Sequence, residues 1–103
     1  MAVVFHRLAA AEFVRARRWY RRRGTDLETR FVLAIEKAIE AIQTHPELGA
    51  AYMKRYRWVR TKHFPYLLYY EVTDASTMLY AVSHARRRLG YWLRRTKRPE
   101  TLP

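Results

Sequence analysis

The sequence has 103 residues, half of them hydrophobic and 15% aromatic, which excludes a disordered chain and is typical of a single domain over residues 1–103. It contains no cysteine, which excludes disulfides and thiolate metal sites. Its formal net charge of +12 favours an anionic partner, and charge alone does not distinguish a nucleic acid from an acidic protein.

The first two predicted elements are a strand and a helix. Residues 2–6 are short and rich in β-branched side chains, which is typical of a strand. The apolar residues that follow recur at helical spacing and predict a buried helix face: Ala9, Phe13, Ala16 and Tyr20, with Leu8 and Trp19 beside them. Gly24 predicts the end of this helix, because glycine readily adopts the left-handed conformation common at helix C-termini.

A second helix is predicted to begin directly afterwards. Thr25 and Glu28 have the spacing of a capping box, in which the threonine accepts from the amide three residues on and the glutamate reaches back. The apolar stripe of this helix consists of Leu27, Phe31, Ala34, Ala38 and Ile42, flanked by Ile35 and Ile39. Pro46 ends it, because proline disfavours helix at the preceding residue. Residues 8–44 therefore predict an antiparallel helical hairpin.

The pattern changes from helix to strand after a turn at residues 46–49. Three strands are predicted at residues 55–60, 66–72 and 78–83, with a hairpin turn at residues 73–76 between the last two. Residues 89–95 form a short aromatic tail or helix. The order β-α-α-β-β-β predicts an α+β fold, with the helical hairpin packed on one face of a small, mostly antiparallel sheet.

Several motifs in this order match one toxin superfamily. The N-terminal half contains Val3-Val4-Phe5-His6 and Trp19-Tyr20, and the C-terminal half contains Phe64-Pro65-Tyr66, His84-x-Arg86-Arg87 and Tyr91-Trp92. Together they resemble the ParE/RelE toxins of type II toxin–antitoxin systems, closer to the ParE side. The resemblance implies a toxin held inactive by an antitoxin whose extended segment wraps it, in a toxin–antitoxin hetero-oligomer.

The two sides of this superfamily differ in mechanism. ParE-type toxins inhibit DNA gyrase without a known nucleolytic step, whereas RelE-type toxins cut mRNA in the ribosomal A site. The motifs favour the ParE-like function, a protein-binding gyrase inhibitor that is not an enzyme. Two alternatives stay open: a RelE-like, metal-independent endoribonuclease acting on the ribosome and its mRNA, and a non-toxic basic nucleic-acid-binding module.

Ribonuclease chemistry needs a base, an acid and cations that stabilise the crowded phosphate. The catalytic candidates for that case are His84, Arg87, Arg57 and Tyr91, with His63 as a weaker one. For binding a partner protein or a phosphate, the expected residues are Arg57, Arg86, Arg87, Arg88, Tyr91, Trp92, Arg94 and Arg95. No spacing of histidines and carboxylates indicates a metal site, and no cofactor is expected.

The same residues also have purely structural interpretations. His84 ends an apolar strand and fits a hydrogen-bonded structural histidine, while Tyr91 and Trp92 fit the edge of a core. The six arginines between Arg15 and Arg23 fit a solvated or antitoxin-docking helix face. Glutamates at helical positions, including Glu12, fit caps or pairs in solvent.

The expected location of the protein is the cytoplasm. The apolar runs are broken by charge far short of the roughly 20 residues that span a bilayer. The N-terminus lacks the charged-then-apolar layout of a signal peptide. We therefore expect no membrane contact.

Overall fold

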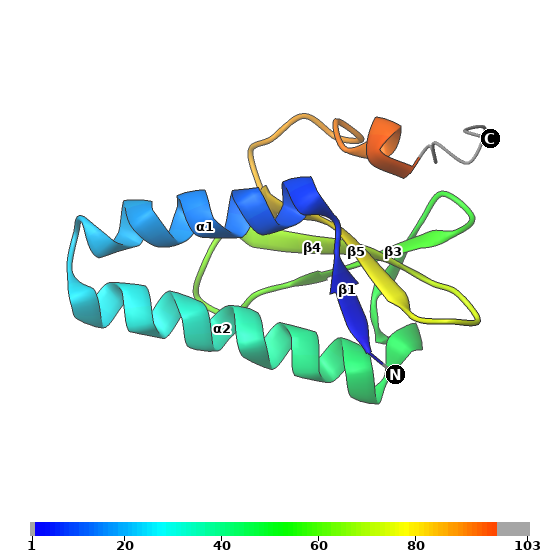
Figure 1. Cartoon of the computed structure of the whole chain (residues 1–103), viewed down its shortest axis with the longest axis horizontal. Helices are drawn as coiled ribbons and strands as arrows, with labels where there is room; N and C mark the ends of the chain where they lie inside the picture. The colour runs from blue at the N-terminus through cyan, green and yellow to red at the C-terminus, as the bar shows by residue number, and fades with distance from the viewer. Residues whose placement is uncertain (1, 97–103) are drawn as a thin grey trace.

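The structure, a computed structural model, describes residues 2–96. Two helices, α1 (Arg7–Arg21) and α2 (Thr25–Thr44), form the predicted antiparallel hairpin and pack together on the sheet (Figure 1). The apolar stripe of α2 is buried as predicted, with Phe31, Ile35 and Ile42 at most 1% exposed. Within residues 2–96, no helix has the length and apolar character needed to cross a bilayer.

The link between the helices differs from the predicted capping box. Gly24 is the N-cap residue of α2 with a φ of 148°, and no side chain caps this helix end. Thr25 is already helical, and Glu28 accepts hydrogen bonds from Arg17 (2.7 Å) and Arg21 (2.8 Å). These bonds, that from Arg21 above all, lower the pKa of Glu28 to about 2. The capping-box prediction is wrong because the charge-assisted bonds from the arginines to Glu28 are stronger than a bond from a neutral backbone amide.

Five strands form one mixed sheet in the order β1-β5-β4-β3-β2. They are β1 (Val3–Phe5), β2 (Ala50–Tyr52), β3 (Tyr56–Arg60), β4 (Tyr66–Val72) and β5 (Thr77–His84). β1 and β5 are parallel, and all other neighbours are antiparallel. The predicted α+β order is confirmed, with β2 as an additional strand. Its three residues are too few for a period-two pattern, so only the pairing with β3 reveals it.

The sheet carries a separate aromatic cluster on each face. Beneath the helices, Phe31 packs against Tyr20 and Phe64, with ring centroids 4.7 and 5.4 Å apart. In the second cluster, Trp92 is fully buried against Tyr69 at 4.9 Å. Trp92 directly precedes the 3₁₀ helix η2 (Leu93–Thr96), which confirms the predicted C-terminal tail or helix. The tail therefore completes a second core and is part of the fold.

On its outer side, β5 has a strand neighbour, β1, only along the first part of its length. β1 ends at Phe5, which pairs with Leu79. On the other side of β5 the register shifts between Tyr69 and Tyr70, which leaves Tyr80 as an extra, bulged residue. Beyond Leu79 the outer edge of β5 therefore faces α1 and the C-terminal segment instead of another strand. This open edge positions the candidate site.

Candidate functional site

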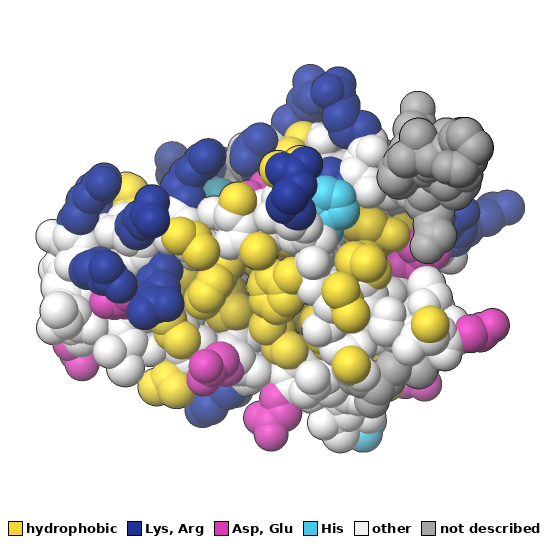
Figure 2. Space-filling view, viewed as in Figure 1, with side chains coloured by type: hydrophobic (Ala, Val, Ile, Leu, Met, Phe, Trp, Pro, Cys, Tyr) yellow, Lys and Arg dark blue, Asp and Glu magenta, His cyan; other side chains and the backbone are white. Residues whose placement is uncertain are grey.

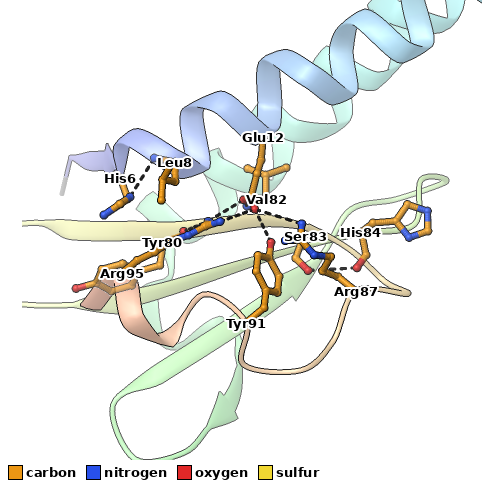
Figure 3. A network of polar contacts seen from close by, with 10 residues as sticks. All are labelled: His6, Leu8, Glu12, Tyr80, Val82, Ser83, His84, Arg87, Tyr91 and Arg95. Atoms are coloured by element: carbon orange, nitrogen blue, oxygen red, sulfur yellow. Dashed lines mark hydrogen bonds and ion pairs between the residues drawn. The ribbon is translucent and has the colours of Figure 1, made fainter. Parts of the chain in front are cut away.

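Glu12 on α1 is the centre of a polar network at the open edge of β5 (Figure 3). Its carboxylate accepts hydrogen bonds from the backbone amide of Val82 (2.9 Å), the hydroxyl of Tyr91 (2.6 Å) and the guanidinium of Arg95 (2.8 and 3.0 Å). Only 13% of the Glu12 side chain and 10% of the Arg95 side chain are exposed. This Glu12 network joins α1, β5 and the tail.

The network replaces the missing strand neighbour of β5. Arg95 donates to the carbonyl oxygen of Tyr80 (2.9 Å), and Glu12 accepts from the amide of Val82. A bare strand edge presents such amide and carbonyl groups for pairing with another chain, and leaving them buried and unpaired costs free energy. Two side chains therefore satisfy the part of the edge that β1 does not reach.

Tyr91 is held as a protonated hydrogen-bond donor. Burial, followed by the hydrogen bond to Glu12, raises the pKa of Tyr91 to about 12. At neutral pH the phenol therefore stays protonated, and its proton already points at a carboxylate. This state suits a structural bond and does not suit a general base.

Arg87 and His84 lie next to this network at the end of β5. The Arg87 guanidinium stacks 3.8 Å from the centre of the Tyr91 ring and lies 3.9 Å from the Glu12 carboxylate, with about half of its side chain exposed. The Nδ1 atom of His84 accepts a hydrogen bond from the amide of Arg86 (3.0 Å). Because Nδ1 is the acceptor, Nε2 carries the proton of the neutral ring. This agrees with the structural interpretation of His84.

A groove of about 400 Å³ lies between α1 and the open edge of β5. Its lining combines aromatic and cationic side chains: Glu12, Arg15, Ala16, Trp19, Tyr20, Pro65, Tyr66, Val82, His84 and Arg87. Trp19 is 46% exposed, whereas its position beside the apolar stripe predicted a place near the core. One residue step turns a helix by about 100°, which carries Trp19 off the buried stripe that contains Tyr20.

Arg57 is not part of this arrangement. Its guanidinium donates to the carbonyl oxygens of Gly49 (2.9 Å) and Glu47 (3.3 Å), which fixes the turn before β2. Arg57 pairs with Tyr70, whereas His84 pairs with Tyr66. Four residues of β4, or about 13 Å of strand, separate the two positions. The structure therefore does not bring Arg57 together with the other catalytic candidates.

The remaining predicted site residues divide by exposure. Arg86, Arg88 and Arg94 are exposed, and with Arg87 we call them the C-terminal basic surface. Trp92 is 0% exposed and Arg95 is bound by Glu12, so both are engaged in the fold. His63 is exposed in the loop before β4. The partner-binding role stays a prediction for the whole set.

Sequence reasoning did not find Glu12 as part of the candidate site. Its helical position fits a solvent pair, but in the structure it binds residues 70 to 83 positions away along the chain. Contacts of this range leave no periodic signal. The one signal in the sequence was the shortage of carboxylates, since the chain has only nine acidic residues for 21 Lys and Arg residues.

Comparison with known proteins identifies the family. Residues 3–89 match the family described as the ParE toxin of the type II toxin-antitoxin system, parDE. The search of curated proteins found no match. The matched span covers the hairpin, the sheet and most of the C-terminal basic surface, and it ends before Tyr91 and Arg95. Because the match extends over more than half of the sequence, the chain belongs to the ParE toxin family, which makes it a type II toxin and implies a cognate antitoxin.

Proposed function

We propose that this toxin inhibits DNA gyrase by binding it and does not cleave RNA. The observation that carries this proposal is the engagement of the candidate catalytic groups. The Tyr91 phenol donates to Glu12, the His84 Nδ1 atom accepts from a backbone amide, and Arg57 is bound to two carbonyl oxygens. A ribonuclease needs such groups free and aimed at one phosphate.

The C-terminal basic surface is the contact region in this proposal. Its arginines follow β5 or lie in η2, and the Glu12 network fixes both segments against α1. Arginine is enriched at protein-binding hot spots, and a rigid base lowers the entropy lost on binding. A complementary acidic region of gyrase would also accelerate association.

One observation favours a RelE-like ribonuclease as the second candidate. His84 and Arg87 line the same groove, so a proton-transfer group and a phosphate-binding cation lie at one place. Arg57 and Tyr91 do not complete that site. The second candidate therefore rests on two residues and would require the Tyr91 hydroxyl to leave Glu12.

The test measures both activities on the same purified protein. We expect inhibition of gyrase supercoiling and intact mRNA in a ribosome-dependent translation mix. His84→Gln is expected to keep the inhibition, and Arg94→Glu to weaken it more than Lys54→Glu, an equal charge change in the exposed β2–β3 turn. Ribosome-dependent mRNA cutting that is lost in His84→Gln or Arg87→Lys, with supercoiling unaffected, would show that the ribonuclease assignment is correct.

Point substitutions test the contact with gyrase more specifically than removal of the C-terminal tail does. We expect deletion from Tyr91 onward to abolish inhibition. However, it also removes the fully buried Trp92 and two partners of Glu12, and so it damages the second core. Arg94 is exposed, so its substitution tests contact and leaves the fold in place.

A further inference from the structure

The outer side of α1 carries three arginines without an acidic partner. Arg15, Arg18 and Arg22 are exposed, and their spacing of three and four positions places them side by side on the helix surface. Within residues 2–96, none of them forms an ion pair with a carboxylate. Figure 2 shows Lys and Arg side chains gathered over α1 and above it. We call these three residues the α1 arginine row.

Two other arginines of the same helix differ from this row. Arg17 and Arg21 bind Glu28 of α2 at 2.7 and 2.8 Å, so the hairpin itself compensates part of their charge. Like charges three or four positions apart destabilise a helix. The repulsion within the α1 arginine row has no such compensation, and a bound anion would relieve it. One helix therefore contains arginines that are engaged in the fold and arginines that are free to bind a ligand.

The α1 arginine row lines a depression of about 500 Å³ on the outside of the helix. Ala10, Ala11, Val14 and Trp19 complete its lining, and none of the described residues that line it is acidic. The alanines are small enough to let a chain lie close to the helix. From the first to the last arginine the helix rises by about 10 Å, which suits a linear polyanion better than a single ion.

Trp19 is exposed in this depression and yet held in place. The guanidinium of Arg23 stacks on its ring at 3.4 Å and also donates to its carbonyl oxygen at 3.2 Å. The ring of Tyr20 meets it edge-on, with centroids 5.0 Å apart. These contacts restrict the indole before any ligand arrives. A pre-positioned ring binds at a lower entropic cost than a mobile one.

A single-stranded nucleic acid is the polyanion that fits both features. Proteins bind such strands with basic side chains that follow the phosphates and with aromatic rings on which bases stack. A duplex keeps its bases stacked on one another and offers none to Trp19. A membrane surface fits less well, because an interfacial helix inserts an apolar face into the lipid. The apolar residues Ala9, Ala16 and Tyr20 of α1 are instead buried in the fold, at most 8% exposed.

We propose that the outer side of α1 binds single-stranded nucleic acid, with phosphates on the α1 arginine row and a base stacked on Trp19. This binding is sequence-tolerant, because every base has a face that can stack. The proposal goes beyond gyrase inhibition and does not depend on gyrase being the target.

The first test compares ligands on the purified toxin. The probes are oligothymidylate, oligouridylate, a DNA duplex of the same length and polyglutamate. We expect one or both single strands to bind more tightly than the duplex and polyglutamate, and the preferred strand distinguishes DNA from RNA. Electrostatic attraction alone would favour the duplex, which has the higher charge density. Tighter binding of the duplex or of polyglutamate would therefore overturn the proposal.

The second test concerns stacking on Trp19. We expect oligothymidylate to quench the tryptophan emission of the toxin and Trp19→Phe to bind with most of the affinity but without quenching. The other two tryptophans differ from Trp19, since Trp92 is fully buried and Trp58 is partly buried on β3. Trp19→Leu, which removes the ring, is expected to weaken binding about tenfold. Quenching that persists in Trp19→Phe would overturn the stacking, whether or not Trp19→Leu folds normally.

The third test uses two neighbouring arginines as a matched pair. Arg18 lines the depression and does not line the groove at the edge of β5, whereas Arg17 is bound to Glu28. Arg18→Gln is expected to reduce the slope of log affinity against log salt by about 0.7, the value for one phosphate contact with a single strand. Arg17→Gln makes the same charge change and is expected to leave the slope nearly unchanged.

The outcomes of this pair decide between local binding and general attraction. Equal slopes in Arg17→Gln and Arg18→Gln would reduce the binding to attraction between the whole cationic toxin and any polyanion, and would overturn the proposal. Tighter binding to phosphatidylglycerol vesicles than to either single strand, weakened by Arg18→Gln, would overturn it in favour of a lipid surface. All these assays are made without gyrase, so they and the supercoiling test fail separately.

Discussion

The hydroxyl of Tyr91 donates a hydrogen bond of 2.6 Å to the carboxylate of Glu12, which joins the first helix to the tail. A bond of this length to an ionised acceptor is of the strong, charge-assisted type. Arg95 binds the same carboxylate and Arg87 stacks on the Tyr91 ring. The position of the C-terminal basic surface is therefore controlled by an acidic residue on another element.

Replacement of Glu12 by glutamine tests this control. Glu12→Gln keeps the size of the side chain and removes its charge, which leaves the nearly buried Arg95 without a counter-ion. We expect the free energy of unfolding to fall by about 2 to 3 kcal/mol. Denaturant unfolding measures the change, and faster hydrogen exchange at the Val82 amide reports opening of the strand edge that Glu12 covers.

Glu36→Gln is the matched control for this substitution. Glu36 is exposed on α2, and we expect a change within about 0.5 kcal/mol. Equal losses in the two variants would mean that the hydrogen bonds of Glu12 add nothing to stability beyond the effect of removing one negative charge.

The pH dependence of stability provides a test of Tyr91. Its pKa is about 12 in the folded protein and near 10 in the unfolded chain, so folding favours the protonated phenol. The contribution is fully present below pH 10 and is lost as the pH rises toward 12. We expect the unfolding free energy of the wild type to decrease more steeply over this interval than that of Tyr91→Phe. Parallel curves would contradict the raised pKa.

The helix register is tested at Phe31. Its side chain is 0% exposed and stacks with Tyr20, so Phe31→Ala is expected to destabilise the protein by about 3 to 5 kcal/mol. Leu33 lies on the same helix with half of its surface exposed, and Leu33→Ala serves as the control. A loss below about 1 kcal/mol at Phe31 would be that of a surface site. Chemical denaturation measures both variants.

The structural role of Arg57 can be separated from a binding role. Arg57→Met keeps a long side chain and removes both hydrogen bonds to the turn before β2. We expect a loss of about 1 kcal/mol in unfolding free energy and unchanged gyrase inhibition. If inhibition disappears while stability is retained, Arg57 belongs to the contact surface.

The sequence was sufficient for the features that repeat along the chain. Helical spacing from Leu27 to Ile42 predicted the buried stripe of α2, and the Pro46 stop and the turn at residues 73–76 both occur in the structure. The turn is closed by a hydrogen bond of 2.8 Å from the amide of Thr73 to the carbonyl of Ser76. These features depend on neighbours within a few residues, which a single sequence displays directly.

Features that depend on distant partners could not be predicted. Glu28 was expected to cap its own helix, but the arginines of α1 bind it once the hairpin has formed. Glu12 was expected to form a helix cap or an ion pair in solvent, and Trp19 was expected to lie next to the core. Whether such a side chain is buried, bound or free depends on which segment lies opposite, and the spacing along one helix does not contain that information.

The parallel pairing of β1 with β5 has a consequence for the order of folding. Val3 pairs with Thr77, and Glu12 binds Tyr91 from 79 positions away, so the first and last elements complete each other. Chains rich in such distant contacts fold slowly compared with helical bundles. During synthesis the helical hairpin emerges before β2 to β5 and consists of local contacts, but the outer edge of β5 cannot close until Tyr91 and Arg95 have been made. The toxin domain therefore reaches its complete form only after the segment that contains Tyr91 and Arg95 has been made.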